Sequence, residues 1–367
     1  MEAMRLIIAG GGSGGHFFPA QAVMNEIIKR KEGVVYMYVG SDSGIESRKW
    51  TLPPGNRRLL SVKGFKNKTA GEKLSSLFLL LESMVESKRI IRDFMPDAVL
   101  GVGGYASFPI VMTAILMRIP AAIHEQNSVP GLANKVLSRF VKEIFISFET
   151  SQKYLPAGKT RLTGLPVRYA MQERKPHASA AVKTILILGG SQGAHQINEM
   201  LVQGLDGLRD IKDRVRFIHQ TGTADRGSVK SAYDRFGFKA DVFDFIDDMA
   251  SVFGQADIAV SRAGASTLFE LAAYGIPSIL IPYPSAASDH QTLNAGEVSF
   301  HGGAVTIPAA TTEPGLLIKH IHGLISDEGR MKDMSAAMMK WAKPSAASDI
   351  VDAMITLAGK AKTCTKE

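Results

Sequence analysis

GGSGGH at residues 11–16 and GGSQGAH at residues 189–195 are two glycine-rich stretches of almost the same spelling, about half a chain apart. Each follows a short apolar run of the kind found in strands buried on both faces of a parallel sheet, and each precedes a segment of helical periodicity. Glycine lets the backbone approach a ligand closely, and the free N–H groups at a helix N-terminus carry partial positive charge. The repeated order of strand, glycine turn and helix predicts two nucleotide-binding-type halves.

Strand-like and helix-like runs alternate along the rest of the chain, which is typical of parallel sheets with crossover helices. We therefore predict the α/β class, with two Rossmann-like parallel-sheet domains. The strand-like runs are residues 5–9, 34–39, 98–102, 121–124 and 143–147 in the first half, and 184–188, 216–219, 258–260, 278–281 and 304–307 in the second.

A glycine and a proline at Thr163-Gly164-Leu165-Pro166 interrupt the chain near its middle. We place the domain boundary there, which gives a first domain of residues 1–163 and a second of residues 164–343. Residues 172–183 read as an exposed connection. A last helix lies within residues 344–367; either half offers it a surface, and we consider packing back on the first domain.

Composition agrees with a soluble two-domain enzyme. The 367 residues exceed one ordinary core, and the apolar and charged fractions of 45% and 21% are those of a globular protein. The single cysteine, Cys364, excludes a disulfide framework or a cysteine metal site within the chain. No signal pattern or apolar run long enough to span a bilayer occurs, so we expect a cytoplasmic protein.

Basic residues are concentrated in the first half. Residues 1–163 hold 22 Lys and Arg against 13 Asp and Glu, whereas the remainder holds 21 against 22. Lys63, Lys66, Lys68 and Lys73 lead into the apolar run 74–81, and Lys88, Arg89 and Arg92 follow it. An apolar helix with a cationic rim suits an anionic membrane surface, although a core helix with solvated lysines is an equal alternative. Nucleic acid is the weakest interpretation, because no stacking aromatics or binding motif accompany the charges.

The first loop also matches G-x-G-x-x-G at Gly10, Gly12 and Gly15, which is a weak dinucleotide signal. The acidic residue usual at the tip of the second strand is missing, since Asp42 comes only further on. Neither loop has the G-K-[ST] of a P-loop. His16 instead stands where a side chain can face a ligand; a lone histidine after a turn usually caps or packs, but the strand-end position favours a functional role.

Three further stretches combine small and polar residues at predicted strand ends. They are residues 101–105 (GVGGY), 124–127 (HEQN) and 261–267 (SRAGAST). Four consecutive polar residues after a buried-type strand favour a ligand site over a solvated loop. The third stretch precedes a helix and predicts a second anion site, and Glu270 one turn later could accept both hydroxyls of a ribose or face only solvent.

Eight sequence motifs, spread over nearly the whole chain, occur in the order found in a known family. They are GGSGGH, GVGGYASFP, HEQN, GLPVR, GGSQGAH, FIDDM, SRAGASTLFE and DHQTLNA. In this order they resemble the MurG family of bacterial enzymes, which transfer N-acetylglucosamine from UDP-N-acetylglucosamine to undecaprenyl-pyrophosphoryl-muramyl-pentapeptide. The resemblance implies a GT-B fold whose two domains face a cleft, inverting glycosyl transfer, and peripheral association with the cytoplasmic face of the plasma (inner) membrane.

The resemblance also implies the site residues. The first domain would bind the acceptor and the second the UDP-sugar, with Asn127 reaching the donor from the first. His290 stands where the family often has glutamine, so its role stays open. The acceptor residues would be Gly14, Gly15, Tyr105 and Asn134; the donor residues would be Ser13, Gly14, Gly15, Asn127, Arg168, Ser191, Ile246, Ala265, Ser266, Thr267, Leu268, Phe269, Glu270 and Gln291.

An inverting transfer needs a base for the 4-hydroxyl of the acceptor. His16 is the first choice because an ordinary imidazole titrates near neutral pH, and His124 with Glu125 is the rival. No D-x-D triplet occurs, so we expect helix N-termini and backbone amides to stabilise the leaving UDP, with no metal and no other cofactor.

Two other functions stay open at this point. One is a related glycolipid synthase that transfers sugar to diacylglycerol, and the other is a nucleotide-sugar or dinucleotide-binding protein without activity. The oligomeric state is not indicated by the sequence.

Overall fold

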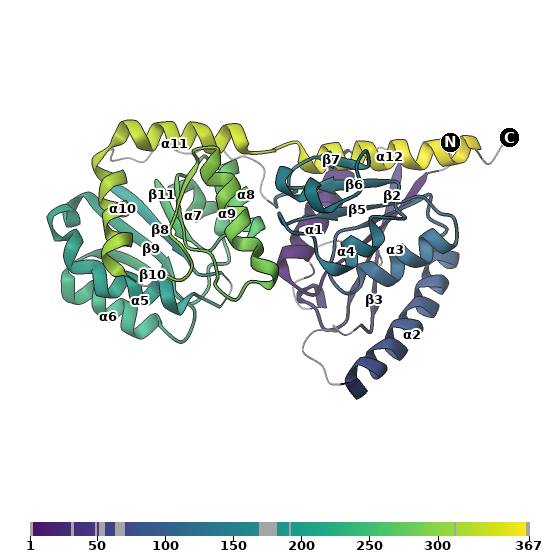
Figure 1. Ribbon diagram of the computed structural model, residues 1–367, viewed down its shortest axis with the longest axis horizontal. Coiled ribbons are helices and arrows are strands. Elements are labelled where there is room, and N and C mark those ends of the chain that lie inside the picture. The colour runs from purple at the N-terminus through teal and green to yellow at the C-terminus, as the bar shows by residue number, and fades with distance from the viewer. Residues whose placement is uncertain are drawn as a thin grey trace. The chain divides into compact units, whose positions relative to one another are not determined.

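The computed structural model describes residues 3–30, 33–47, 50, 56–62, 70–168, 182–190, 192–311 and 313–364, with the backbone alone for residues 70–78, 287 and 361–364. The chain divides into two compact units, each built on one parallel sheet (Figure 1). The first unit is Met1–Arg168 with Lys343–Glu367, and the second is Tyr169–Ala342. Most of the connection expected at residues 172–183 lies outside the described residues.

The first unit holds a seven-stranded sheet in the order β3-β2-β1-β4-β5-β6-β7, with every neighbouring pair parallel. The strand order reverses between β1 and β4, and such a reversal is where Rossmann-type sheets bind ligands. The strands are β1 (Met4–Ala9), β2 (Val34–Ser41), β3 (Arg57–Leu60), β4 (Ala98–Gly101), β5 (Ala121–Glu125), β6 (Glu143–Ile146) and β7 (Thr160–Leu162).

The second unit repeats this plan with six parallel strands in the order β10-β9-β8-β11-β12-β13. Its reversal lies between β8 and β11. The strands are β8 (Lys183–Leu188), β9 (Val215–Gln220), β10 (Lys239–Phe243), β11 (Ile258–Ser261), β12 (Ser278–Leu280) and β13 (Ala304–Thr306).

Helices connect the strands of each sheet. Those of the first unit are α1 (Gly14–Arg30), η1 (Ile45–Ser47), α2 (Ala70–Phe94), α3 (Ser107–Leu116), α4 (Leu132–Leu137), η2 (Glu149–Tyr154) and α12 (Ala346–Cys364). Those of the second are α5 (His195–Gly204), η3 (Leu205–Arg214), α6 (Arg226–Phe236), α7 (Met249–Gln255), α8 (Ala265–Ala273), η4 (Ala287–Asp289), α9 (His290–Phe300), α10 (Pro314–Ser326) and α11 (Glu328–Trp341).

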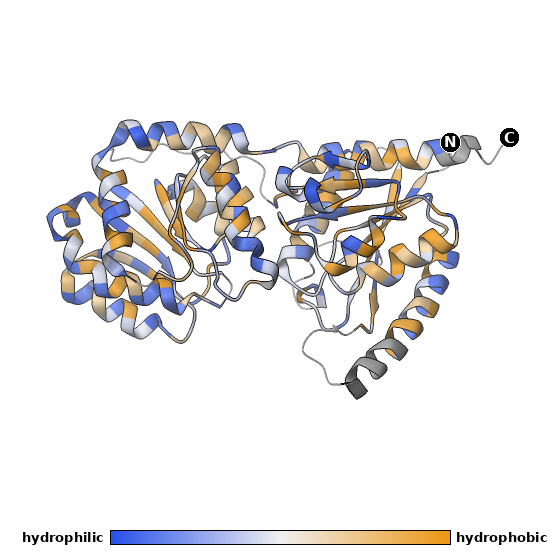
Figure 2. Ribbon diagram, in the orientation of Figure 1, coloured by the Kyte–Doolittle hydropathy of each residue, from blue (hydrophilic) through white to orange (hydrophobic). Residues whose placement is uncertain are grey.

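The predicted strands are confirmed, since each of the ten apolar runs forms a strand of one of the two sheets. Strand β1 shows why these runs are unbroken. Ile7 and Ala9 belong to one hydrophobic core and Leu6 and Ile8 to another, on the opposite face. Both faces of the strand are covered, so no polar residue alternates with the apolar ones; Figure 2 shows the hydrophobic strands inside each unit.

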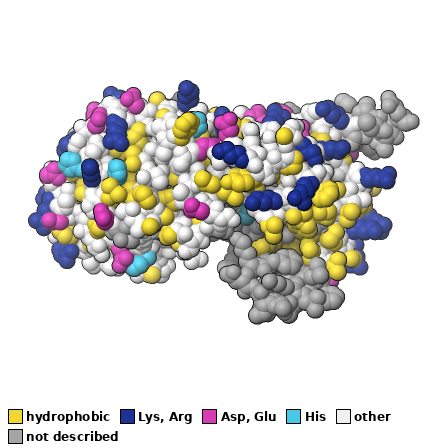
Figure 3. All heavy atoms as spheres, viewed as in Figure 1, with side chains coloured by type: hydrophobic (Ala, Val, Ile, Leu, Met, Phe, Trp, Pro, Cys, Tyr) yellow, Lys and Arg dark blue, Asp and Glu magenta, His cyan; other side chains and the backbone are white. Residues whose placement is uncertain are grey.

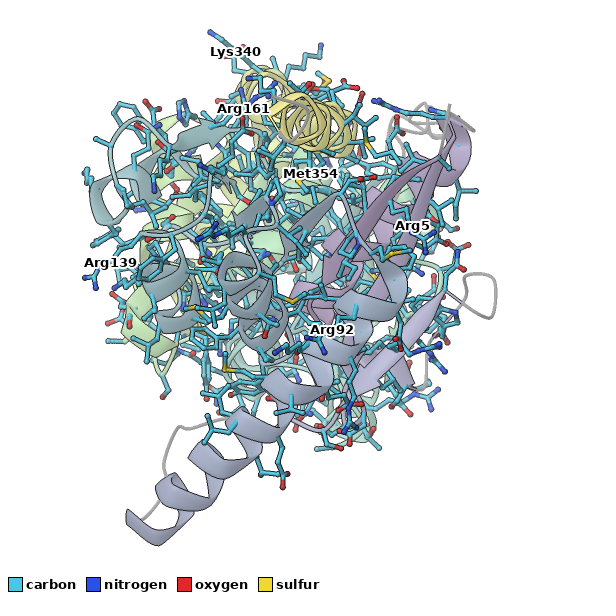
Figure 4. The ribbon with its side chains drawn as sticks, turned by 90° about the vertical axis from the view of Figure 1, so that its right-hand side faces the viewer. Arg5, Arg92, Arg139, Arg161, Lys340 and Met354 are labelled. Carbon is cyan, nitrogen blue, oxygen red and sulfur yellow. The ribbon has the colours of Figure 1, made fainter. Side chains whose placement is uncertain are left out.

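Helix α12 packs in the first unit, where it completes the core that contains Leu6 and Ile8. Ile350, Val351 and Met354 are each at most 1% exposed, and Figure 4 shows Met354 on the underside of this helix. Arg30, the last residue of α1, fixes the contact: its guanidinium donates to the carboxylates of Asp352 and Glu26 and to the backbone of Ser348. These charge-assisted bonds raise the pKa of Arg30.

Replacing Arg30 by alanine should destabilise the first unit. The variant loses hydrogen bonds between a charged donor and acceptors on α12, and each such bond is worth about 1.5–3 kcal/mol. We expect a lower urea midpoint and faster proteolysis within α12. The control is Lys29→Ala on the exposed side of the same helical turn. Equal midpoints for the two variants would contradict the role given to Arg30.

Candidate active site

The first glycine loop joins β1 to α1 and packs backbone to backbone against the turn after β4. A Cβ at Gly104 would lie 2.1 Å from the carbonyl oxygen of Gly11, so only glycine allows this contact. Gly11 and Gly12 have φ angles of 131° and 90°, which other residues rarely adopt. Helix α1 begins directly afterwards at Gly14. The His16 N–H donates to the Ser13 carbonyl at 3.1 Å, whereas the N–H groups of Gly14 and Gly15 come before the first intrahelical acceptor and can bind an anion.

Glu46, which the sequence analysis missed, holds this loop in place. Its side chain is fully buried, and both carboxylate oxygens accept from the Gly12 N–H, at 2.9 and 3.0 Å. The Ser41 N–H donates to the same carboxylate at 2.7 Å. This is the acidic residue that seemed absent after the second strand; it binds the loop itself, whereas Asp42 is exposed. Because the carboxylate occupies the Gly12 N–H, that amide is not free to bind a dinucleotide pyrophosphate.

His16 lies in the first turn of α1, against the glycine turn after β4. Its Nδ1 is 3.0 Å from Ser13 Oγ, and a Cβ at Gly103 would lie 2.6 Å from the Cδ2 of the ring. The absence of a side chain at Gly103 therefore makes room for the imidazole. Burial lowers the pKa of His16 to about 4, so the ring is neutral at physiological pH. A neutral imidazole is able to accept a proton.

His124 is fully buried, and both of its ring nitrogens are occupied. The carbonyl oxygen of Gly164 lies 3.0 Å from Nε2, so Nε2–H is the donor. Nδ1 then accepts from the side-chain amide of Gln126, at 3.1 Å. Burial lowers the pKa of His124 to about 4. Gln126 also donates to the carbonyl of Val102 at 2.6 Å, so this pair ties β5 to the turn after β4.

Glu125 organises the loop that follows β5. Its carboxylate accepts from the N–H groups of Asn127 and Gly131, at 3.0 and 3.1 Å, and from the side-chain amide of Asn134, at 2.8 Å. Burial raises the pKa of Glu125 even though these bonds oppose the shift. The carboxylate thus holds Asn127 and Asn134. The imidazole of His124 is not among these hydrogen-bond partners.

The other predicted residues of the first unit differ in how far they are exposed and in what they contact. Tyr105 is 53% exposed after the glycine turn, whereas Asn134 is 4% exposed on α4. The guanidinium of Arg168 stacks on the ring of Phe18, 3.6 Å from its centroid. Arg168 therefore belongs to the first unit, beside α1, although the resemblance groups it with the nucleotide.

The second unit contains a cavity of about 900 Å³ at the carboxyl ends of β8 and β11. Helices α5 and α8 begin at it, and among the described residues no carboxylate lines it. The lining includes the second glycine loop, Arg262, Thr267 and Gln291. This is the switch point of the second sheet, so glycine backbone and two helix N-termini face one space. Within the described ranges, no three His, Cys, Asp or Glu side chains are grouped to hold a metal ion.

Of the predicted donor residues, Thr267 and Gln291 line this cavity and Ser191 lies outside the described residues. Ala265 and Ser266 form the first turn of α8. Leu268 and Phe269 are buried in the core, at most 2% exposed, so only their backbone could meet a ligand. Glu270 is 8% exposed on the same helix. Of the predicted donor residues, the cavity therefore brings together Thr267, near the N-terminus of α8, and Gln291.

Gln220, at the end of β9, was not predicted; it connects the second glycine loop to the segment that follows β10. Its side-chain amide donates to the carbonyl of Gly190 at 2.6 Å, and its Oε1 accepts from the Ile246 N–H at 3.0 Å. Because this bond uses the amide of Ile246, only the carbonyl of that residue is left to meet a base. A polar residue at a strand end was the available signal.

Arg262 and Gln291 shape the far side of the cavity. The Arg262 guanidinium donates to Gln196 Oε1 and to the carbonyls of Ile281 and Pro282, at 3.0 to 3.1 Å. Burial lowers its pKa, but an arginine stays cationic. Gln291 Oε1 accepts from two backbone N–H groups, at 3.2 and 2.9 Å. The arginine gives the cavity a positive charge, and the glutamine keeps its NH₂ group as a donor.

Replacing Glu46 by glutamine should destabilise the first glycine loop. The amide oxygen can still accept from the Gly12 and Ser41 N–H groups in the place of Oε1, but the new NH₂ group then stands in the place of Oε2, 3.0 Å from the Gly12 N–H, where it faces a donor instead of an acceptor. A buried donor left without an acceptor costs about 1–3 kcal/mol. We expect a lower melting temperature, measured by calorimetry. Asp42→Asn is the matched control, since the same exchange four residues away alters an exposed side chain. A melting temperature unchanged in Glu46→Gln would refute this assignment.

Comparison with known proteins agrees with these two units. The glycosyltransferase family 28 N-terminal domain matches residues 6–146, and the C-terminal domain of that family matches residues 184–353. A UDP-N-acetylglucosamine--N-acetylmuramyl-(pentapeptide) pyrophosphoryl-undecaprenol N-acetylglucosamine transferase of Geobacter metallireducens is 42% identical over 98% of this chain and 100% of that protein. The protein of the same name from Thermodesulfovibrio yellowstonii is 42% identical over 95% and 97% of the two chains.

Solved structures give the same result. MurG of Acinetobacter baumannii superposes with a TM-score of 0.78 at 29% identity, over 96% of this chain and 99% of that one. A UDP-GlcNAc 2-epimerase of Neisseria meningitidis, with a TM-score of 0.63 at 14% identity over 96% and 100%, shares the fold alone. The predicted pair of Rossmann-like domains of the GT-B fold is thereby confirmed, and the chain is a glycosyltransferase. It belongs to glycosyltransferase family 28 and, within it, to the MurG family.

Proposed function

We propose that this enzyme transfers N-acetylglucosamine, with inversion, from UDP-N-acetylglucosamine to the 4-hydroxyl of undecaprenyl-pyrophosphoryl-N-acetylmuramyl-pentapeptide, the last cytoplasmic step of peptidoglycan precursor synthesis. The observation that carries the proposal is full-length identity of 42% to relatives named for this donor and acceptor. The groups that line the cavity of the second unit suit a UDP-sugar and so support the proposed donor. The acceptor named for these relatives disfavours the alternative, a synthase acting on diacylglycerol.

The UDP-sugar would bind in the cavity of the second unit. Two helix N-termini, glycine amides and the charge of Arg262 suit a diphosphate. Glu270 and Thr267 would hold the ribose and a phosphate, and the NH₂ group of Gln291 would donate to the sugar hydroxyls. The backbone of Ile246 would reach the uracil.

The acceptor diphosphate would bind at the N–H groups of Gly14 and Gly15, beside Tyr105. His16 would be the base. When Nδ1–H donates to Ser13 Oγ, the lone pair lies on Nε2 and takes the proton of the 4-hydroxyl while oxygen attacks the anomeric carbon. His124, whose nitrogens are both hydrogen-bonded in the buried loop, would position this site instead of acting as the base.

Replacing His16 by alanine should reduce turnover about 10²- to 10⁴-fold, the usual contribution of a general base. UDP binding should stay unchanged, because the cavity proposed for the UDP-sugar lies in the second unit. Since the pKa of His16 is about 4, the base stays deprotonated above that pH, and the acid limb of kcat/KM should appear only as the pH drops toward 4.

The assay follows radiolabelled sugar from UDP-N-acetylglucosamine to a short-chain muramyl-pentapeptide lipid, with diacylglycerol in parallel. The control is His301→Ala, an exposed histidine of the second unit. Full turnover in His16→Ala would mean that another group is the base. Transfer to diacylglycerol alone would rule out the proposed acceptor.

We further propose that the first unit docks on an anionic membrane surface, at the cytoplasmic face of the plasma membrane. Leu81 and Val85 on α2 are 53% and 56% exposed, and Leu116 on the neighbouring α3 is 67% exposed. Lys88 and Arg92 continue the stripe of Leu81 and Val85 at helical spacing. Figure 3 shows hydrophobic side chains gathered on this unit with Lys and Arg beside them, and Figure 4 labels Arg92 on α2.

The first part of the predicted membrane segment lies largely outside the described side chains. Lys63, Lys66 and Lys68 lie outside the described residues, and for Lys73 and the run up to residue 78 only the backbone is described. None of the described helices combines the length and apolar character of a membrane span.

Replacing Leu81 and Val85 together by aspartate should weaken binding to vesicles that contain anionic lipid at least tenfold, because apolar contact is lost and like charges repel. Co-sedimentation at low and high salt measures this. The control is Phe300→Asp, which alters an apolar side chain that is 84% exposed on the second unit. Binding equal to that of the control would contradict docking through α2.

A further inference from the structure

His195 and Asp225 form a hydrogen-bonded pair at the rim of the second unit's cavity. His195 is the first residue of α5 and lines the cavity. Its Nδ1 lies 3.1 and 3.0 Å from the two carboxylate oxygens of Asp225, so Nδ1–H is the donor. The histidine side chain is 71% exposed and Asp225 only 16%. An exposed imidazole is thus held by a partner that is nearly buried.

A chain of buried groups fixes Asp225 from behind. The side-chain amide of Asn198 donates to Asp225 at 2.7 Å, and His219 Nε2–H donates to the Asn198 oxygen at 3.0 Å. His219 Nδ1 then accepts from the Tyr233 hydroxyl at 3.1 Å. Burial lowers the pKa of His219 to about 3, so this ring stays neutral and its two nitrogens keep fixed roles. An ordinary surface ion pair has no such support.

The charges around His195 favour its protonated form. The hydrogen bond that His195 donates to the Asp225 carboxylate is the main cause that raises the pKa of His195, and the charges of Asp225 and Glu199 add to it. Glu199 lies one turn along α5, 3.4 Å from Nε2 and 56% exposed. Arg262 lines the same cavity and is the other cation there. The Nε2–H of His195 therefore has only a long, solvated contact to give up when an anion binds.

Resting on the function proposed above, we propose that the Nε2–H of His195 donates a hydrogen bond to a β-phosphate oxygen of the bound UDP-sugar and stabilises UDP as it leaves. The bond between the anomeric carbon and the β-phosphate oxygen breaks, and its electron pair goes to that oxygen. The new bond uses an electron pair of the acceptor 4-oxygen, whose proton goes to His16. His195 keeps its own proton throughout, and Asp225 is a positioning residue.

The test compares His195→Gln with His322→Gln. His322 is a second histidine of this unit that pairs with a carboxylate, Asp210, at 2.8 Å, and it is 40% exposed. We expect His195→Gln to lower kcat about 10- to 100-fold, as for the loss of one charged hydrogen bond, and to weaken UDP binding about tenfold by calorimetry. Uridine binding and the melting temperature should not change, because the lost contact is to phosphate and the side chain is exposed.

The pH profile separates the role of Asp225 from a structural one. In the wild type, kcat should fall on the alkaline side as His195 loses its proton, and Asp225→Asn should move this limb to lower pH. In His195→Gln the limb should disappear. A variant His195→Gln with the kcat, UDP affinity and alkaline limb of His322→Gln would overturn the inference. Failure of the wild type to transfer N-acetylglucosamine would instead refute the proposed function, and the binding of UDP against uridine would still decide the role of His195.

Discussion

Close backbone contacts that only glycine allows, at the strand ends, are the constraint on which both units depend. In the first, Gly104 touches the carbonyl of Gly11; in the second, a Cβ at Gly193 would lie 1.9 Å from the carbonyl of Thr221. Each contact brings the loop after the first strand of the sheet onto the turn of a neighbouring strand. A single methyl group would separate them, and the N–H groups of the following helix would no longer face a common space.

In each unit a side chain at or after the end of the adjacent strand hydrogen-bonds to the glycine loop. It accepts from the loop in the first unit and donates to it in the second. In the first, Glu46 follows β2 and accepts the N–H of Gly12. In the second, Gln220 ends β9 and donates to the carbonyl of Gly190. The acid uses an N–H group and adds negative charge, whereas the amide uses a carbonyl and leaves N–H groups available. For an anion as highly charged as a nucleoside diphosphate, the second loop is electrostatically the better site.

The sequence predicts the interior of this fold better than its edges. Buried parallel strands are continuous apolar runs, so all ten were found. Three of the four edge strands, β3, β7 and β10, were missed because they carry charged, exposed residues such as Arg58, Arg161 and Asp241. The fourth, β13, was found because its sequence, Ala304–Thr306, carries no charge. The glycine turns and the start of the helix after each of them were also predicted from the sequence. Partners distant in sequence were not, since nothing local relates Glu46 to Gly12 or Asp225 to His195.

The histidines show why residue type alone did not settle the chemistry. His16, His124 and His219 all lie in surroundings that lower their pKa, whereas a nearby carboxylate raises that of His195. A desolvated neutral ring can accept a proton or hold two fixed hydrogen bonds, and a carboxylate-bound ring can supply positive charge. The proposed inverting transfer would use both states at once, because a proton leaves the nucleophile while negative charge develops on the departing phosphate. Separate burial of one imidazole and carboxylate pairing of the other allow both states to exist at a single pH.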